Sequence, residues 1–513
     1  MHLQPHFAQC ALLAAITLAN AQLPFEAPDN AVPAPVDFVG FGFETAFMNN
    51  FANDFSYNML NSVSTRLNTP LTIRIGGTSG DRVLFDPSQG ETAVCIAGDC
   101  PLGSAATYIL GPTYFNGFKG FQGFNMTFQA PLGPVLNISN TLAYATQAYD
   151  NIGEDRLAAV AIGNEPNLYP IQYRISYTLG QYVNDVKTVM NYISQTLGFY
   201  TSGNNIYEVL NLAAGSRPSD LIDAFEDGLN SFGNVKVAAL HWYQLQNYCT
   251  TLAQQQFYLM NHTITTSLFD SCNSQIDYLN TNDPEVRFVL SETGSGLRSA
   301  IAVQGGFGAA LWSIDFRLYS LTQGVARVDA TQRPAALHSY WVPDNSAGYV
   351  NPGPQVRAPW YALPFIADFL GQKPGKVAEV DLGSDTLTAY AIYDANTNAV
   401  SKVALLNLRV WVAGESTNNR GLENVSFPLP VNNISYTVRR LQSAAGAQAM
   451  GFDYGGPEQS ITWAGEEWSY SVDQGRGHSV EGVVPVETYT VTDGEVEVAI
   501  LDSEAIIINF GGL

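Results

Sequence analysis

Between about residue 36 and residue 329, short apolar runs alternate with stretches in which apolar residues recur every three or four positions. Short runs bounded by turn residues predict buried strands, and the three-to-four spacing predicts amphipathic helices. The predicted strands lie near Val36–Phe43, Leu71–Ile75, Gly123–Phe128, Leu157–Ile162, Glu208–Ala213, Val235–Leu240, Val286–Leu290 and Val325–Asp329. The clearest predicted helices are Asn53–Leu67, Gly180–Leu197, Ser219–Leu229 and Phe307–Leu321.

Strands that alternate with helices predict a parallel sheet, and eight such units favour a closed (β/α)8 TIM barrel. An open doubly wound sheet is the alternative architecture. It usually carries a glycine-rich phosphate-binding loop after its first strand, and Phe41-Gly42-Phe43-Glu44 does not supply one. The segment from Thr78 to Pro134 is long and rich in Gly, Pro and aromatic residues. It follows the second predicted strand, where barrel enzymes build their substrate clefts.

From about Pro359 the pattern changes to alternating apolar and polar residues separated by Gly, Asn and Asp turns. Such alternation predicts antiparallel strands with one buried face. These strands are predicted near Thr386–Tyr393, Val403–Val412, Ser435–Leu441 and Val496–Asn509. The expected fold is therefore α/β, with the barrel at 22–355 and a C-terminal antiparallel β-sandwich domain at 356–513.

The first residues resemble a targeting signal. Cys10–Leu18 is almost continuously apolar and ends in Ala19-Asn20-Ala21, the pattern of a secretory signal peptide and its cleavage site. A buried N-terminal strand is the alternative, because the start of the chain carries no Lys or Arg. We expect residues 1–21 to be a signal peptide, the mature chain to begin near Gln22, and the protein to be secreted and extracellular.

The cysteines and glycosylation motifs agree with this location. Four cysteines follow the signal, and their spacing favours the disulfides Cys95–Cys100 and Cys249–Cys272. A metal site is the alternative, but no CxxC pair or clustered His accompanies these cysteines. N-linked glycans are expected at the sequons that begin at Asn125, Asn137, Asn261, Asn424 and Asn433.

Composition narrows the class of partner. The 513 residues are 46% hydrophobic and only 13% charged, which excludes a disordered chain or a coiled coil. The net charge is −23, and a field of that sign repels phosphate backbones. After the signal, no stretch is long and apolar enough to span a bilayer. We therefore expect neither a nucleic-acid partner nor a membrane partner.

Two glutamates stand out by their position. Glu165 follows the strand predicted at Leu157–Ile162 and comes directly after Asn164, whereas Glu292 follows the strand predicted at Val286–Leu290. Both carboxylates therefore lie where barrel enzymes place their catalytic residues. Either one alone is as well explained by a helix cap or a structural ion pair. Together they indicate a pair of catalytic carboxylates.

Several motifs narrow the family. They are Gly163-Asn164-Glu165-Pro166, Leu290-Ser291-Glu292-Thr293, Val39-Gly40-Phe41-Gly42-Phe43-Glu44, Arg74-Ile75-Gly76-Gly77-Thr78-Ser79, His241-Trp242-Tyr243 and Phe307-Gly308-Ala309-Ala310-Leu311-Trp312. In this order they resemble glycoside hydrolase family 79, the β-glucuronidase/heparanase family, in its secreted fungal branch. The resemblance covers most of the chain after the signal. It implies a retaining enzyme in which two carboxyl groups lie about 5–5.5 Å apart.

The resemblance also implies roles for individual residues. Glu292 would be the nucleophile and Glu165 the acid/base. Asn164 would bind the sugar 2-hydroxyl, and Tyr243 would donate a hydrogen bond to Glu292. Further substrate-binding candidates are Arg74, Glu44, Gly294, Arg298 and Tyr340. Arg74 would be the positive partner of a carboxylate, although a structural ion pair is equally consistent with it.

Recognition of the glucuronyl carboxylate is where the sequence departs from the family. Gly294 begins a stretch small enough for backbone amides to approach an anion, and Arg298 follows it. After the eighth strand, fungal members more often carry a His-rich stretch. This chain has Arg333 and Tyr340 there instead, either of which could compensate.

No Gly-x-Ser-x-Gly elbow, His-Glu-x-x-His motif or phosphate-binding loop is present, so we expect no cofactor and no metal. The sequence predicts a secreted retaining exo-β-glucuronidase that releases glucuronic acid or its 4-O-methyl form from polysaccharide or proteoglycan side chains. Two alternatives remain open: a retaining β-xylosidase or arabinofuranosidase of the same fold, and a non-catalytic carbohydrate-binding wall protein.

Overall fold

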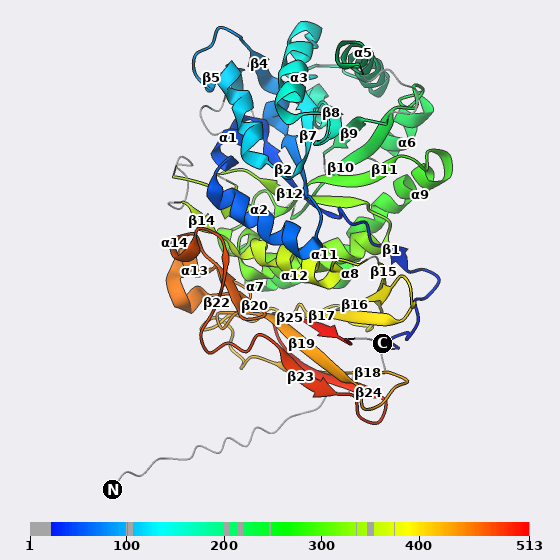
Figure 1. Ribbon diagram of the computed structural model, residues 1–513, viewed down its shortest axis with the longest axis vertical. Helices are drawn as coiled ribbons and strands as arrows, with labels where there is room; N and C mark the ends of the chain where they lie inside the picture. Colours follow the sequence, from blue (N-terminus) through cyan, green and yellow to red (C-terminus); the bar gives the residue numbers. More distant parts are fainter. Residues whose placement is uncertain are drawn as a thin grey trace.

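The computed structural model describes residues 22–98, 100, 106–198, 205–213, 215, 217, 219–245, 248–334, 336–345, 353–373 and 375–511. Figure 1 shows a barrel with surrounding helices stacked on a second body made of strands. The expected signal peptide at 1–21 lies outside the described residues. Within the described part of the chain, no helix has the length and apolarity needed to cross a bilayer.

Eight parallel strands close the barrel, in the order β10-β11-β12-β2-β3-β7-β8-β9. They are β2 (Val39–Glu44), β3 (Thr72–Gly76), β7 (Asn125–Ala130), β8 (Leu157–Ile162), β9 (Tyr207–Leu212), β10 (Val235–Leu245), β11 (Arg287–Gly296) and β12 (Arg327–Gln332). The predicted (β/α)8 barrel is confirmed, and the open-sheet alternative is wrong. Because all carboxyl ends of the strands meet at one face, the residues after β8 and β11 are brought to the same opening.

The surrounding helices begin where the sequence supplies caps. In α2 (Asp54–Leu67), the Asn53 side chain accepts a hydrogen bond from the first turn, and Thr178 and Gln181 form a capping box at α5 (Leu179–Leu197). Other barrel helices are α3 (Ile138–Ile152), α6 (Ser219–Glu226), α8 (His262–Phe269), α9 (Asn273–Asn282) and α11 (Phe307–Thr322). Helix α11 is buried along nearly its whole length between the barrel and the sheet domain, and most of its side chains are apolar.

The C-terminal domain is confirmed as antiparallel β. Its main sheet has the order β1-β15-β16-β17-β25-β19-β20-β21-β22, with β23 paired to β19. The strands are β15 (Gly375–Val380), β16 (Leu387–Asp394), β17 (Val400–Asn407), β19 (Ser435–Gln442), β20 (Thr462–Trp463), β21 (Glu466–Trp468), β22 (Gly477–Ser479), β23 (Glu487–Thr490) and β25 (Glu504–Asn509). A second layer, β18 (Leu422–Pro428) paired with β24 (Glu495–Leu501), covers one face over an apolar core.

The N-terminal end of the described chain also belongs to this domain. Strand β1 (Val32–Pro33) pairs antiparallel with β15, and Glu26 bridges to Ala399. Leu23 packs into the same apolar core as β16 and β17. The sheet domain is therefore built from both ends of the chain, whereas the expected boundary assigned all residues from 22 to 355 to the barrel.

A cluster of charged side chains joins the barrel to the C-terminal sheet domain. His262, the first residue of α8, has Nδ1 at 2.9 Å from Asp315 Oδ1 in α11 and Nε2 at 2.8 Å from Glu379 Oε1 in β15. Burial by itself would lower the pKa of His262, but the adjoining charges of Asp315 and Glu379 raise it to about 10. The imidazolium therefore holds a carboxylate of the barrel and one of the sheet together.

One of the two expected disulfides is wrong. Cys95 and Cys100 are bonded, but Cys249 and Cys272 are free thiols buried in the core. Cys249 precedes α7 (Leu252–Tyr258) and Cys272 ends the short helix after α8. Both pack as small apolar side chains, and burial raises the pKa of each thiol. Sequence spacing shows that a loop could close, whereas a disulfide also requires the two side chains to meet.

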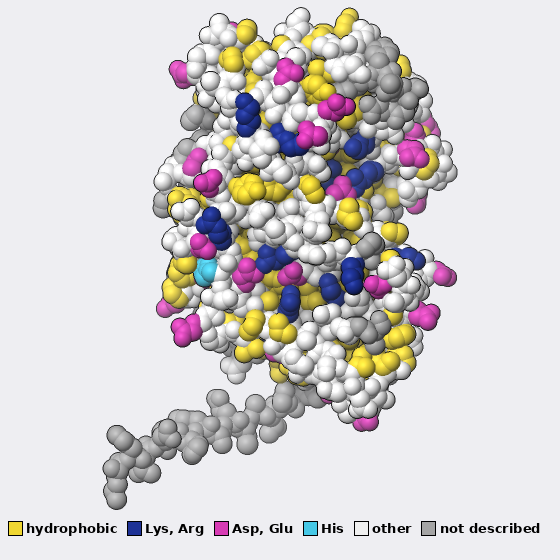
Figure 2. Space-filling view, viewed as in Figure 1, with side chains coloured by type: hydrophobic (Ala, Val, Ile, Leu, Met, Phe, Trp, Pro, Cys, Tyr) yellow, Lys and Arg dark blue, Asp and Glu magenta, His cyan; other side chains and the backbone are white. Residues whose placement is uncertain are grey.

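The sequons differ in their surroundings. Asn424 and Asn433 are exposed in the sheet domain. Asn137 and Asn261 cap α3 and α8 through their side chains. Asn125 begins barrel strand β7, and the Thr127 of its sequon is fully buried. On the face drawn in Figure 2, charged side chains are scattered over a largely neutral surface, in keeping with the low charged fraction.

Candidate active site

Glu165 follows the C-terminal end of β8, where the backbone has a conformation that few residues other than glycine adopt. Gly163 has φ 72° and Glu165 has φ 50°, both in the left-handed region. A Cβ at Gly163 would lie 2.9 Å from Leu132 Cδ2 and from the Tyr169 hydroxyl, so the close turn requires glycine. The Glu165 N–H donates to the Asn211 carbonyl at 2.9 Å. This turn directs the Glu165 side chain toward His241 on β10.

Glu292 lies within β11 at a β-bulge. Leu290 pairs with Leu240, but Glu292 pairs with His241, so Ser291 is the extra residue. The Ser291 hydroxyl fills the gap by donating to Asn211 Oδ1 at 2.7 Å. Bulges re-aim the residues beside them, and this one places Glu292 at the barrel opening.

The two carboxylates face each other across the opening. His241 Nδ1 is 3.0 Å from Glu165 Oε1 and 3.7 Å from Glu292 Oε2, and one oxygen of each carboxylate and one nitrogen of His241 all lie within 4.8 Å of one another. Retaining glycosidases use carboxyl groups about 5–5.5 Å apart, and inverting enzymes use about 6.5–9.5 Å. The separation therefore suits attack by one carboxylate while the other protonates the leaving group.

Glu292 is held ionised. Burial alone would raise the pKa of this carboxyl, but His241 and Arg74, together with the hydrogen bond from Tyr243, lower it below the ordinary value. The Tyr243 hydroxyl donates to Glu292 Oε1 at 2.5 Å, and Arg74 Nη1 lies 3.8 Å from Glu292 Oε2. An anion in this state is a nucleophile.

Arg74 is part of a line of alternating charges inside the barrel. Its Nε lies 3.1 Å from Glu208 Oε1, and Glu208 Oε2 is 3.7 Å from Arg327 Nη2. Arg327 in turn binds Asp329, whose pKa burial raises to about 6. Arg74 therefore shares its charge between Glu208 and Glu292.

Asn164 is positioned by both of its neighbours. Arg74 Nη2 donates to Asn164 Oδ1 at 3.0 Å, and the Asn164 N–H donates to Asp81 Oδ2 at 3.1 Å. Because the amide oxygen is occupied, Nδ2 is the group that Asn164 can present to a sugar hydroxyl. Asp81 is buried and also accepts from the Tyr169 hydroxyl at 2.5 Å.

Glu44, at the end of β2, is a third carboxyl near the pair. Burial and the charge of Glu292 raise its pKa to about 7, although Ser79 donates to it through both its hydroxyl and its N–H. A Cβ at Gly77, where φ is 90°, would lie 2.6 Å from the Glu44 carboxyl carbon. The Arg-Ile-Gly-Gly motif therefore provides both the charge beneath Glu292 and the space for Glu44.

Gly294 supports Tyr243 by having no side chain. A Cβ there would lie 2.9 Å from Tyr243 Cε1 and 3.0 Å from the His338 ring. His338 packs against Tyr243 with ring centroids 5.3 Å apart, and its Nδ1 is 3.0 Å from the Gly296 carbonyl. That contact makes Nδ1 the donor and leaves Nε2, which is buried without a partner in the described structure, as an acceptor.

The structure does not bring two of the predicted substrate-binding residues to the carboxylate pair. Arg298 lies exposed beyond the end of β11. Tyr340 is buried under the barrel, where its hydroxyl is 3.1 Å from Ser313 Oγ and 3.4 Å from Arg317 Nη2. Its hydroxyl is therefore committed to the protein core.

Sequence reasoning missed two residues of this site, Asp81 and His338, whereas Arg333 was already a candidate for binding the sugar carboxylate. Arg333 is close enough to lower the pKa of both Glu44 and His338, and its Nε is buried with no hydrogen-bond partner in the described chain. Burial and Arg333 together bring the pKa of His338 to about 4, so the ring is neutral. The available signal for His338 was a histidine soon after the eighth strand.

Among the described residues, one cluster has the ligand types and spacing for a metal ion, and it is the trio Glu165, His241 and Glu292. Arg74 and Tyr243 already compensate the charge of Glu292. The trio is therefore equipped for acid–base and nucleophilic chemistry without an ion.

A parallel barrel with two carboxylates at its carboxyl face and an attached β domain defines the class of barrel glycoside hydrolases. A family described as the glycosyl hydrolase family 79 C-terminal beta domain matches residues 389–507. A β-glucuronidase of Aspergillus niger is 28% identical over 524 residues, which cover 94% of this chain and 92% of the relative. The chain is therefore similar to glycoside hydrolase family 79 in its C-terminal domain and to a fungal β-glucuronidase over most of its length.

Other relatives agree in fold. A β-glucuronidase of Neurospora crassa is 24% identical and covers 87% of this chain and 86% of its own length. The solved 4-O-α-L-rhamnosyl-β-D-glucuronidase of Fusarium oxysporum 12S superposes with a TM-score of 0.76 at 22% identity, covering 96% of this chain and 100% of that one. A family 51 arabinofuranosidase of Xanthomonas axonopodis pv. citri has a TM-score of 0.63 at 11% identity, covering 93% of this chain and 97% of that one. The two solved structures show that barrel and β domain recur together.

Proposed function

We propose that the protein is a secreted retaining exo-β-glucuronidase that releases glucuronic acid or 4-O-methylglucuronic acid from glycan side chains. The observation that carries this proposal is the pair Glu165 and Glu292, with oxygens within 4.8 Å and Glu292 held ionised by Arg74 and Tyr243. The similarity to two fungal β-glucuronidases supports glucuronic acid as the sugar.

In the first step, Glu292 Oε2 attacks the anomeric carbon while Glu165 gives its proton to the glycosidic oxygen. The bond to the leaving group breaks and a glycosyl ester of Glu292 forms. Asn164 Nδ2 donates to the sugar 2-hydroxyl, a hydrogen bond that strengthens as positive charge develops at the anomeric carbon. Tyr243 keeps Glu292 Oε1 hydrogen-bonded, which leaves Oε2 for attack.

In the second step, Glu165, now ionised, removes a proton from water. The water oxygen bonds to the anomeric carbon, the ester breaks, and Glu292 returns to its anionic form. His241 lies between the two carboxylates and is positioned to stabilise whichever of them is charged. The cycle returns both groups to their starting protonation.

The sugar carboxylate needs local donors, because the protein carries a net charge of −23. Arg333 is the cation near Glu44 and His338, and its guanidinium has an unpartnered buried Nε. We assign the carboxylate to Arg333 and to the backbone amides at Gly294, in place of the expected Arg298 and Tyr340.

The test is release of 4-nitrophenol from its β-glucuronide at acidic pH by the wild type and by Glu292→Gln. We expect turnover in the wild type and a loss on the order of 10⁴-fold or more in the variant. Hydrolysis of the 4-nitrophenyl β-xyloside or α-arabinofuranoside instead would keep the mechanism and overturn the sugar assignment. Failure on all three substrates would favour a non-catalytic binding protein.

Secretion and glycosylation belong to the same proposal. Residues 1–21 have the pattern of a signal peptide, and the sequons at Asn424 and Asn433 are exposed. Expression in a fungal host should place the protein in the medium with an N-terminus near Gln22, and a glycosidase that removes N-glycans should lower its mass. Retention inside the cell would contradict the proposal.

A further inference from the structure

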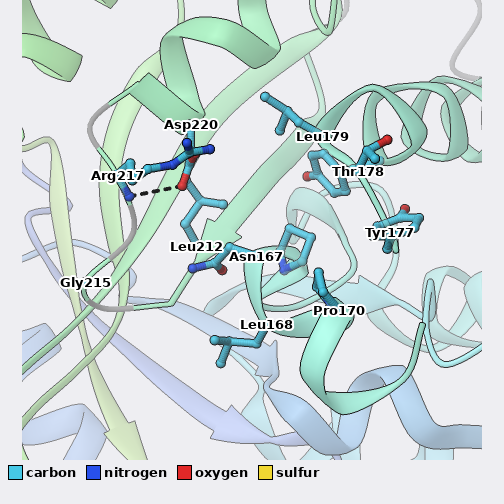
Figure 3. A pocket seen from close by; sticks show the side chains of 12 residues that line it. Asn167, Leu168, Pro170, Tyr177, Thr178, Leu179, Leu212, Gly215, Arg217 and Asp220 are labelled. Atoms are coloured by element: carbon cyan, nitrogen blue, oxygen red, sulfur yellow. Dashed lines mark hydrogen bonds and ion pairs between the residues drawn. The ribbon is translucent and has the colours of Figure 1, made fainter. Parts of the chain in front are cut away.

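A hollow of about 390 Å³ lies between the loop that follows β8 and the first turn of α5. Figure 3 shows side chains from both segments and from the end of β9 surrounding a common space, with the Arg217–Asp220 pair closing one side. Much of the wall is apolar. Its principal side chains are Leu168, Pro170, Tyr177, Leu179 and Leu212.

The wall of the hollow includes residues that directly follow Glu165, the proposed acid, in the chain. They are Pro166–Leu168, and the wall also includes Leu212, which follows Asn211. The Asn211 carbonyl accepts the Glu165 N–H at 2.9 Å. Asn167 Oδ1 accepts the Ala213 N–H at 3.0 Å, which ties the two loops together. A group in the hollow is therefore held by the same loops that hold the proton donor.

The two tyrosines in the wall of the hollow, Tyr177 and Tyr182, are held in place by hydrogen bonds through their hydroxyl groups. The Tyr177 hydroxyl donates to Asp185 at 3.0 Å, and the Arg174 guanidinium lies 4.7 Å from the Tyr177 ring while binding the same Asp185 at 2.7 Å. The Tyr182 hydroxyl accepts the Leu210 N–H at 2.6 Å. Because both hydroxyls are occupied, these residues have apolar surface left for a ligand.

The surface beside the hollow is apolar as well. Ile171 is 83% exposed and Ile175 is 92% exposed, and both belong to the segment between Glu165 and α5. The two isoleucines add exposed apolar surface to the segment that also supplies Leu168, Pro170 and Tyr177 to the hollow.

We propose that this hollow receives the part of the leaving group that lies beyond the ring next to the glycosidic oxygen, and that it holds one such ring by an apolar face. The inference rests on the proposed function, because Glu165 gives its proton to the leaving oxygen and the leaving group must lie on that side. The volume is within the range of small-molecule sites, which bind rings largely through apolar contact. A sugar ring and a phenolic ring share this chemistry.

The test compares three glucuronides: the 4-nitrophenyl compound, a glucuronosyl oligosaccharide with at least two further sugars, and the glucuronide of a multi-ring phenol. In Tyr177→Ala we expect KM to rise about fivefold to tenfold for at least one extended substrate and to stay unchanged for the 4-nitrophenyl compound. A raised KM for the oligosaccharide identifies the bound group as a sugar ring, and a raised KM for the phenol glucuronide identifies it as an aromatic ring.

The matched control is Tyr192→Ala, an exposed tyrosine elsewhere on α5, which should leave all three substrates unaffected. Leu168→Ser is the second variant, in case loss of Tyr177 disturbs the fold. The inference is overturned if KM rises equally for all three substrates, or if it stays unchanged for both extended substrates. Failure of the wild type on the 4-nitrophenyl glucuronide, with hydrolysis of another glycoside, would overturn the sugar assignment instead.

Discussion

Residues that look alike in the sequence differ in charge state once the barrel is closed. Glu292 and Glu44 both end or follow a barrel strand, yet the pKa of the first is lowered and that of the second is raised to about 7. The difference comes from their neighbours: Glu292 faces Arg74 and Tyr243, whereas Glu44 faces the charge of Glu292 itself. In the proposed mechanism, Glu292 attacks as an anion, while Glu44 remains a hydrogen-bond donor below neutrality.

Glu44→Gln should separate these roles. Ionised Glu44 would repel both Glu292 and an anionic sugar, so wild-type kcat/KM should fall as the pH rises through about 7. The amide cannot ionise, so the variant should lose the part of this alkaline decline that Glu44 contributes near pH 7, while keeping activity at lower pH. Profiles of kcat/KM between about pH 4 and 9 measure the effect. The same decline in both proteins would contradict the role given to Glu44.

Glu208→Gln should act on the acidic side of the profile. Arg74 divides its charge between Glu208 and Glu292, so a neutral amide in place of the Glu208 carboxylate leaves more of that charge for Glu292. We expect a further lowered pKa of Glu292 and an acidic limb of kcat/KM displaced to lower pH. The variant should also be less stable by roughly 3–5 kcal/mol, because it breaks a buried ion pair. An unchanged limb would show that Glu208 only supports the barrel.

At the scale of the elements, the type and order of the barrel strands could be predicted because short apolar runs alternate regularly with helical stretches along the chain. The sequence could not predict the bulge at Ser291, which depends on pairing between β10 and β11. It also read Val496–Asn509 as one strand, whereas β24 and β25 are separated by a turn in which Ser503 has φ 53°. Pairing and backbone geometry are properties of the folded chain.

The proximity of Glu165 and Glu292 was predictable because each follows a recognisable apolar run. Tyr340 was misjudged because a residue's distance from a strand does not tell which way its side chain points. Asp81 was not predicted, since nothing in a single sequence shows that four groups converge on it. Cys249 and Cys272 mislead for the same reason, since proximity in sequence is not contact.

Gly294→Ala tests the packing of strand β11. The new methyl group would press on the Tyr243 and His338 rings and displace the hydrogen bond to Glu292. We expect kcat to fall about 10- to 100-fold, as a misplacement near 1 Å can produce. The control is Gly180→Ala on α5, where a Cβ meets open space and activity should not change. Full activity in Gly294→Ala would contradict the packing argument.

At the scale of the whole molecule, His262 makes the stability of the assembly depend on pH. Its folded pKa of about 10 lies above the ordinary 6.5. Stabilisation is therefore complete below about pH 6.5 and is lost as the pH rises toward 10. The two bodies are thus held together most firmly under acidic conditions.

His262→Gln should remove this dependence. We expect the free energy of unfolding of the wild type to fall by on the order of 4 kcal/mol more than that of the variant between about pH 6 and 10. Thermal unfolding at a series of pH values measures the difference. His478→Gln is the control, because His478 lies in the sheet domain and does not contact the barrel carboxylate Asp315. Parallel curves for wild type and His262→Gln would exclude this cluster of charged side chains as the cause.

The place of β25 in the sheet has a consequence for synthesis of the protein. This strand follows every other described strand in the chain, yet it lies between β17 and β19 in the middle of the sheet, while β1 is made first and waits to pair with β15. The barrel strands are complete once residue 332 has left the ribosome, but the sheet stays split until residues 504–509 emerge. Closure of the sheet is therefore a late event in folding, and a chain cut before residue 504 would lack the centre of the domain.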